Sequence, residues 1–118
     1  MTVRVLIVDD QAPFRMAARM VVDATDGFDV VGEAGNGKQA ISEVERLRPD
    51  VVLLDVQLPD VDGFAIAERL AAEGSCAAVV LISSREAAAY GPRLEAAAAT
   101  GFIAKRELSG EALAALLP

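Results

Sequence analysis

Two patterns of apolar and polar residues recur along this chain. Short apolar runs that end on polar residues are separated by longer stretches in which apolar residues recur every three or four positions. The short runs indicate buried β-strands, and the longer stretches indicate amphipathic helices. The predicted strands are residues 3–8, 28–33, 50–55, 77–82 and 101–104.

The stretches between and after these strands predict five helices. They are residues 11–24, a segment around 40–47 that ends before Pro49, residues 62–73, residues 86–99, and a short last helix with Ser109 as its N-cap. Gly91-Pro92 must break or kink the fourth of them. Strands that alternate with helices, joined by right-handed crossovers, predict an α/β fold with a parallel sheet and helices on both faces. We expect residues 1–118 to form one domain.

The run from Asp50 to Asp55 is the centre of this prediction. Four consecutive aliphatic residues between two acids indicate a strand that is buried on both faces, as in a parallel sheet. Asp55 would then lie at the carboxyl end of the strand, where open α/β sheets bind and transform ligands.

Composition narrows the class of protein. The 118 residues are 53% hydrophobic, yet no apolar run approaches the roughly 20 residues needed to cross a bilayer. The apolar segment at the N-terminus is too short for a signal peptide, so we expect a cytoplasmic protein that does not bind membranes. Eighteen acidic against 11 basic residues give a net charge of −7, which disfavours direct binding to nucleic acid. The single cysteine, Cys76, is expected to be a small buried residue at the start of a strand.

Polar residues that could bind a ligand or react chemically lie at four predicted strand ends. Asp9 and Asp10 end the first strand, Asp55 the third, Ser83 the fourth and Lys105 the fifth. Each has an ordinary interpretation: a helix cap for Asp10, an acceptor of loop amides for Asp55, a turn serine and a surface lysine. Parallel strands bring their carboxyl ends to one edge, so together these residues predict one site.

Such a cluster has a specific chemical use. Three neighbouring carboxylates repel one another, and a cation relieves that repulsion. Because the available ligands are hard oxygens, Mg²⁺ with several retained waters is favoured. A carboxylate nucleophile beside Mg²⁺ can accept a phosphoryl group as an aspartyl phosphate, and Lys105 and Ser83 could hold its other oxygens.

Over essentially its whole length the chain resembles the receiver domain of two-component response regulators. The motifs that carry the resemblance are Val8-Asp9-Asp10, Leu54-Asp55 followed by Leu58-Pro59 and Asp62-Gly63, Ile82-Ser83-Ser84, and Gly101-Phe102-Ile103-Ala104-Lys105. The resemblance implies a flavodoxin-like sheet of order 2-1-3-4-5 with a switch point between strands one and three.

The resemblance also implies roles for these residues. Asp55 would take a phosphoryl group from a sensor histidine kinase, and the chain would catalyse only its own phosphorylation and dephosphorylation. Mg²⁺ would be held by Asp9 or Asp10, the Asp55 carboxylate and the Gln57 backbone carbonyl, with Asp10 as the direct ligand and Asp9 acting partly through water. Ser83 would then follow the new phosphate.

The resemblance also implies how the signal would pass from the site to a partner. Lys105 would stabilise the phosphoryl group, and Phe102 would change rotamer with it. The face formed by helix four, strand five and helix five would thereby change shape for an unknown partner or effector. The resemblance leaves open whether phosphorylation leads the chain to form a homodimer.

The chain departs from the family pattern at two positions. Arg106 stands where many receivers have Pro, which predicts a trans peptide bond after Lys105 and a differently shaped loop. Phe102 replaces a common Tyr and has no hydroxyl to donate. The ending from Gly101 to Leu108 is more similar to receivers attached to helix-turn-helix transcription factors. We therefore weigh a single-domain regulator, which we favour, against a receiver excised from such a transcription factor.

A hydrolytic phosphatase of the haloacid dehalogenase type is a rival that also uses a strand-end aspartate. It would need a second aspartate as general acid two residues later, where this chain has Gln57. A pseudo-receiver would lack site residues, and none is missing here.

Overall fold

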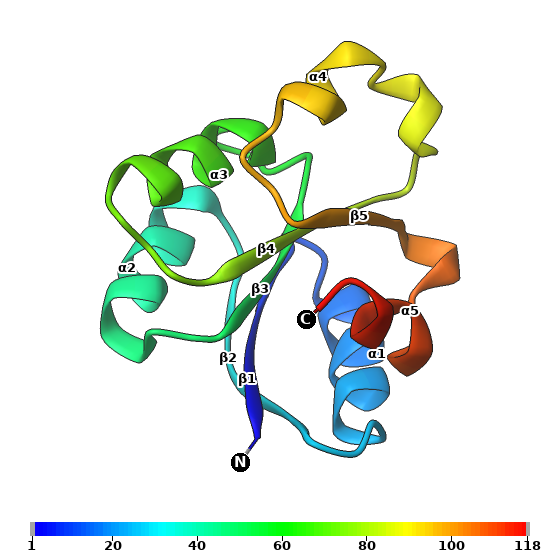
Figure 1. Cartoon of the computed structure of the whole chain (residues 1–118). Helices are drawn as coiled ribbons and strands as arrows, with labels where there is room; N and C mark the ends of the chain where they lie inside the picture. Colours follow the sequence, from blue (N-terminus) through cyan, green and yellow to red (C-terminus); the bar gives the residue numbers. More distant parts are fainter. Residues whose placement is uncertain (1, 118) are drawn as a thin grey trace.

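Five parallel strands form one sheet in the order β2-β1-β3-β4-β5 in the computed structural model, which describes residues 2–117 (Figure 1). The strands are β1 (Val3–Val8), β2 (Phe28–Ala34), β3 (Val51–Asp55), β4 (Ala78–Ser83) and β5 (Gly101–Ala104). Every neighbouring pair is parallel. The predicted fold class and strand order are confirmed, and the order reverses direction between β1 and β3.

The central strand β3 is buried along its whole length. All five of its residues are buried, because β1 and β4 flank its edges and helices cover both faces of the sheet. The unbroken apolar run after Asp50 is therefore explained by burial on two faces. Its last residue, Asp55, is carried into the protein interior with it.

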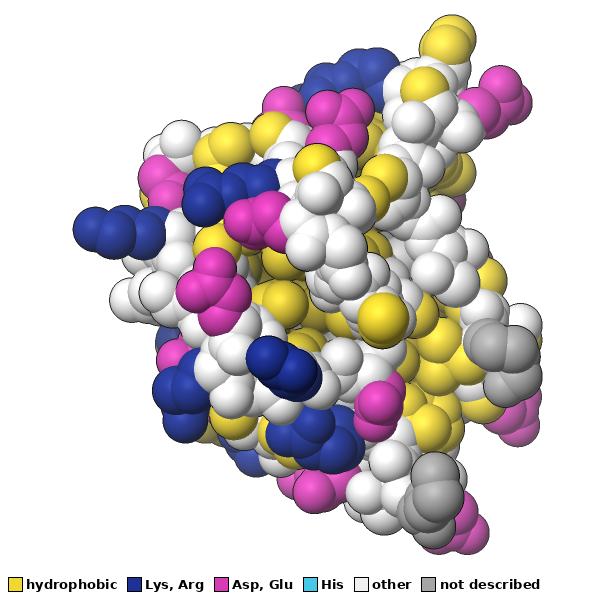
Figure 2. Space-filling view, turned by 60° about the vertical axis from the view of Figure 1, so that its left-hand side comes forward, with side chains coloured by type: hydrophobic (Ala, Val, Ile, Leu, Met, Phe, Trp, Pro, Cys, Tyr) yellow, Lys and Arg dark blue, Asp and Glu magenta, His cyan; other side chains and the backbone are white. Residues whose placement is uncertain are grey.

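Helices cover the two faces of the sheet unequally (Figure 1). α1 (Ala12–Asp23) and α5 (Gly110–Ala115) pack on one face, where Ala18, Val22 and Leu113 join the apolar core. α2 (Gly37–Leu47) and α3 (Gly63–Ala72) lie on the other face, together with α4 (Pro92–Ala96). Figure 2 shows the molecule turned toward the α2 and α3 side, where acidic and basic side chains are interspersed over apolar surface.

Helix starts follow local chemistry. Asn36, Asp62 and Ser109 each accept a hydrogen bond from the backbone N–H three residues later, which caps α2, α3 and α5. The cap predicted at Ser109 is confirmed. α1 instead begins after Gln11, whose side chain makes no capping bond, and Pro13 lies in the first turn. Asp10 therefore does not cap this helix.

The break predicted at Gly91-Pro92 is confirmed, but the helices predicted on either side of it over residues 86–99 are much shorter than expected. Only a 3₁₀ turn, η1 (Ala87–Ala89), and the five-residue α4 form there. Gly91 has a φ of 52°, a left-handed conformation, and Pro92 lacks the N–H that would continue a helix across it. No residue of η1 or α4 is fully buried, and Leu94 is the only one of them that packs against the core, so little packing supports the helical propensity.

Two smaller expectations can be compared with the structure. Cys76 is exposed, because β4 begins only at Ala78 and leaves the thiol in the preceding turn, so the prediction of a buried cysteine is wrong. The peptide bond between Lys105 and Arg106 is trans, as predicted, since residues 2–117 contain no cis bond. Within the same residues, no helix is long and apolar enough to cross a bilayer.

The short helix α5 depends on one side chain. Leu113 is its only buried residue and is 0% exposed, packed in the core beneath the β1–β3–β4 face. We expect Leu113→Ala to lower the free energy of unfolding by about 2–5 kcal/mol through lost burial and a residual cavity. Urea unfolding followed by circular dichroism measures this. Met20→Ala, at a side chain that is 69% exposed, should cost less than about 0.5 kcal/mol. Equal losses for both variants would contradict this account of α5.

Candidate functional site

Asp55 lies at the carboxyl end of β3, only 4% exposed. Its Oδ1 accepts a hydrogen bond of 3.1 Å from the Gln57 backbone N–H, so the loop-amide interaction weighed from the sequence does occur. The chain must turn sharply here, and Gly63 makes that possible. A Cβ atom at Gly63 would collide with the Asp55 backbone carbonyl.

The loop that follows Asp55 is held from both sides. Gln57, which is exposed, pairs with Asp62 in an isolated antiparallel bridge. The Asp60 carboxylate accepts hydrogen bonds from the backbone N–H groups of Gly37 and Lys38 at the start of α2, at 2.8 and 3.1 Å. The hydrogen bond from the Gly37 N–H, together with the other backbone N–H groups around the carboxylate, lowers the pKa of Asp60 below its ordinary value. The loop is thereby fixed beside the site.

Asp9 and Asp10 differ in burial. Asp9 is 0% exposed and its Oδ1 accepts a 2.8 Å hydrogen bond from the Gln11 N–H, whereas Asp10 is exposed. Arg15 donates from its guanidinium to the Asp9 backbone carbonyl at 2.6 Å and also pairs with Glu33. These contacts hold the turn between β1 and α1, so the buried carboxylate has a fixed position.

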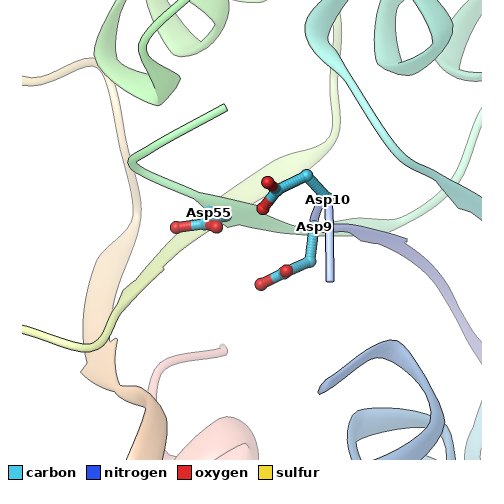
Figure 3. Close-up of side chains that lie close together, drawn as sticks. All are labelled: Asp9, Asp10 and Asp55. Atoms are coloured by element: carbon cyan, nitrogen blue, oxygen red, sulfur yellow. The ribbon is translucent and has the colours of Figure 1, made fainter. Parts of the chain in front are cut away.

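Three carboxylates converge at this edge. Figure 3 shows the side chains of Asp9 and Asp10, from the end of β1, pointing toward Asp55 on the neighbouring β3. One oxygen from each of the three lies within 4.8 Å of the others. The sequence prediction that these acids meet is confirmed by their placement.

Lys105 brings the opposing charge from β5. Its Nζ lies 2.6 Å from Asp9 Oδ2 and 3.4 Å from Asp55 Oδ2, and it stands 4.5 Å from the ring centre of Phe14. Burial alone would lower the pKa of Lys105, but its contacts with the two carboxylates outweigh burial and raise that pKa. The lysine therefore stays charged, and its side chain is only 16% exposed.

The pKa of Asp55 is raised from 3.8 to about 6, chiefly by burial. The negative charge of Asp9 also acts to raise it, while the Gln57 N–H and Lys105 act to lower it. One ammonium group does not compensate fully for two buried carboxylates.

The donor set fits a hard divalent cation. Asp9 Oδ2 is a fully buried oxygen whose partner among residues 2–117 is the Lys105 ammonium group at 2.6 Å. One carboxylate oxygen each from Asp9, Asp10 and Asp55 lies close to the other two. Buried carboxylate oxygens with unused lone pairs and an exposed neighbour open to water match the preferences of Mg²⁺.

Ser83 ends β4 beside Asp55, and its hydroxyl points to a residue that the sequence did not reveal. Ser83 Oγ lies 2.5 Å from Tyr90 Oη and accepts a hydrogen bond of 3.0 Å from the Arg85 N–H. Tyr90 sits in an alanine-rich stretch whose apolar pattern gives no sign of this contact. Its one distinguishing mark is that it is the chain's only tyrosine.

Phe102 is half-buried on β5 and packs edge-on against Tyr90, with ring centres 5.9 Å apart. The structure therefore places Asp9, Asp10, Asp55 and Lys105 in one cluster. Ser83 adjoins it but is bonded elsewhere, and Phe102 lies beyond Tyr90.

The buried Asp55 makes stability depend on pH. A raised carboxyl pKa means that the folded protein holds the proton more tightly than the unfolded chain, so the free energy of unfolding falls as pH rises from about 4 to about 6. We expect Asp55→Asn to raise this free energy by about 1–3 kcal/mol at pH 7.5, with the gain shrinking toward pH 4. Thermal and urea unfolding of chelator-treated protein across this range measure the gain.

Asp29→Asn, at an exposed carboxylate on β2, is the matched control and should change stability little at any pH. If the gain in stability from Asp55→Asn did not depend on pH, the loss of stability in the wild-type chain could not be attributed to the Asp55 charge.

Comparisons with known proteins agree on one family. The chain matches the model for the response regulator receiver domain over residues 5–117. A Pseudomonas aeruginosa protein named as a transcriptional regulator is 38% identical over 112 residues, which are 95% of this chain and 54% of that protein. The protein-glutamate methylesterase/protein-glutamine glutaminase of Alkalilimnicola ehrlichii is 37% identical over 116 residues, covering 94% of this chain and 29% of that enzyme. The chain thus spans about half the length of the first relative and under a third of the second.

Solved structures extend the similarity to the fold. The response regulator domain of Thermotoga maritima CheB superposes with a TM-score of 0.85 at 27% identity, covering 98% of this chain and 94% of that one. The signal receiver domain of NarL from Mycobacterium tuberculosis gives 0.83 at 31% identity, covering 98% and 96%.

Proposed function

The chain belongs to the family of response regulator receiver domains of two-component systems, and from that premise we propose that Asp55 is its phosphoacceptor. The observation that carries the proposal is the contact of Lys105 Nζ with the carboxylates of both Asp9 and Asp55. Strands one, three and five thus meet in a buried charge cluster that a phosphoryl group and a cation could complete. The proposal treats residues 1–118 as one receiver domain.

Asp55 acts as a nucleophile in this proposal. A carboxylate oxygen forms a bond to phosphorus while the bond between phosphorus and the donor, a phosphohistidine of a sensor kinase, breaks and the imidazole leaves. With a pKa of about 6, Asp55 is mostly ionised at pH 7.5 and is ready to attack. Hydrolysis by water reverses the modification, so the chain catalyses only its own phosphorylation and dephosphorylation.

Mg²⁺ would be held by the carboxylates of Asp9, Asp10 and Asp55 and by the backbone carbonyl of Gln57. The bound cation would supply charge neutralisation at the phosphoryl oxygens. The fixed loop after Asp55 supports this role for Gln57, because Asp60 anchors it to the start of α2. Asp10, which is exposed, would be the direct ligand, and the buried Asp9 would act partly through water.

Lys105 and Ser83 would hold the other phosphoryl oxygens. Lys105 already stands between two carboxylates, and a phosphoryl group on Asp55 offers it a stronger partner. Ser83 would have to turn toward Asp55 to donate its proton. Phe102 would respond through the aromatic packing around Tyr90.

The partners follow from this chemistry. A sensor histidine kinase in the cytoplasm would supply the phosphoryl group, and the face formed by α4, β5 and α5 would carry the signal to a separate partner or to an effector region on the same polypeptide. The net charge of −7 argues against direct nucleic-acid binding by this domain. A homodimer formed on phosphorylation is compatible with the same face.

Phosphoryl transfer can be tested with a small donor. We expect acetyl phosphate and Mg²⁺ to add one phosphoryl group to the chain, because the site itself supplies nucleophile and charge stabilisation. Intact mass spectrometry detects the adduct. Asp55→Asn should abolish it, and the matched Asp29→Asn should not. An adduct that persists in Asp55→Asn would refute the assignment.

Cation binding gives an independent readout. Mg²⁺ should raise the melting temperature at pH 7.5 by relieving carboxylate repulsion, with about 1.4 kcal/mol of stabilisation at ten times its Kd. Asp10→Asn should weaken the effect, and so should a pH below 6, where Asp55 is protonated. Differential scanning calorimetry measures the shift. A melting curve unchanged at millimolar Mg²⁺ would count against the site.

A further inference from the structure

Tyr90 holds an unusual position beside the site. It is half-buried in the turn after η1, and its Oη lies 2.5 Å from Ser83 Oγ. Its ring packs edge-on against Phe64 of α3 and Phe102 of β5, with centre distances of 5.5 and 5.9 Å. Aromatic contacts on two sides fix the ring, and the fixed ring in turn fixes the direction of its hydroxyl.

The Ser83 hydroxyl is hydrogen-bonded to residues that follow β4 and not to the carboxylates. Its two hydrogen-bond partners among residues 2–117 are Tyr90 Oη and the Arg85 N–H, and both belong to the segment after β4. Lys105, by contrast, contacts Asp9 and Asp55. The Ser83 hydroxyl has one proton, so for Ser83 to donate it to a phosphoryl oxygen on Asp55, a bond in which Ser83 donates to Tyr90 must break.

We propose that Tyr90 is a positioning residue that holds the Ser83 hydroxyl in its resting orientation, so that phosphorylation of Asp55 must exchange the Ser83–Tyr90 bond for a Ser83–phosphoryl bond. This rests on the proposed phosphorylation of Asp55. The two partners compete for one hydroxyl, so the bond to Tyr90 opposes phosphorylation and phosphorylation releases Tyr90. The coupling is reciprocal by thermodynamic linkage.

Release of Tyr90 would also loosen the segment that follows it, which contains α4. No residue of α4 is buried, and the segment turns through Gly91. Besides Tyr90, its polar attachment is Arg93, which pairs with Asp62 at 3.0 Å and stands 4.5 Å from the Phe64 ring centre. An exposed ion pair contributes little to stability. Leu94 and Ala97 pack partly buried against the core, so limited apolar contact, one exposed ion pair and the hydroxyl bond of Tyr90 attach this segment to the sheet.

The test is the rate of phosphorylation by acetyl phosphate in a double-mutant cycle. Tyr90→Phe keeps the aromatic packing and removes the competing hydroxyl, so the rate should rise roughly two- to tenfold, the range for one hydrogen bond. In a Ser83→Ala background the same change should have no effect. Ser84→Ala, at an exposed neighbouring serine, should leave the rate at its wild-type value.

Fluorescence supplies a second readout, because the chain has one tyrosine and no tryptophan. Acrylamide quenching of Tyr90 should increase on phosphorylation of the wild-type chain and should change much less in Ser83→Ala. An unchanged or lower rate in Tyr90→Phe would overturn the proposal, and so would an equal gain in the Ser83→Ala background. If the wild-type chain accepts no phosphoryl group, the proposed function itself fails, and the two failures are thereby distinguished.

Discussion

Two carboxylates buried side by side, with one ammonium group against them, are the constraint on which this structure depends. Asp9 and Asp55 lie at the ends of adjacent central strands, where apolar neighbours exclude water and strengthen their repulsion. Lys105 compensates only in part, as the raised pKa of Asp55 indicates. The remaining repulsion lowers the stability of the fold at this edge of the sheet, and additional positive charge there would relieve it. Buried charges that are left incompletely paired are typical of functional sites.

The surrounding fold keeps that arrangement in place. Arg15 binds the Asp9 carbonyl and Asp60 binds the start of α2, so the turns on either side of the cluster are fixed by charged hydrogen bonds. Gly63 lets the third helix begin against the Asp55 backbone. In contrast, the segment from residue 86 to 97 lies over the sheet with few buried contacts. Rigid support therefore surrounds the carboxylates, and the less firmly held part lies beside Ser83, where a conformational response costs least.

The sequence was sufficient to predict the sheet and which polar side chains end its strands, because apolar runs and strand-end polar residues follow directly from parallel packing. Asp55, Lys105 and the acids of β1 meet as the pattern predicts. Side-chain direction was not predictable in the same way. Nothing in the pattern distinguishes buried Asp9 from exposed Asp10, or joins Ser83 to Tyr90, since both depend on the backbone path of a turn. The helix predicted in the alanine-rich stretch rested on helical propensity alone. Most of this stretch is not buried, and a short helix needs burial to be stable.

The order in which the chain contributes its site has a consequence for synthesis. Asp9, Asp55, Ser83 and Lys105 lie far apart in the sequence and meet only through the parallel pairing of β1, β3, β4 and β5. Pairings of this kind are non-local and form late in folding. A chain that ends before β5 would hold two buried carboxylates with no ammonium group against them. The charge cluster is therefore complete only when the last strand has paired with the sheet.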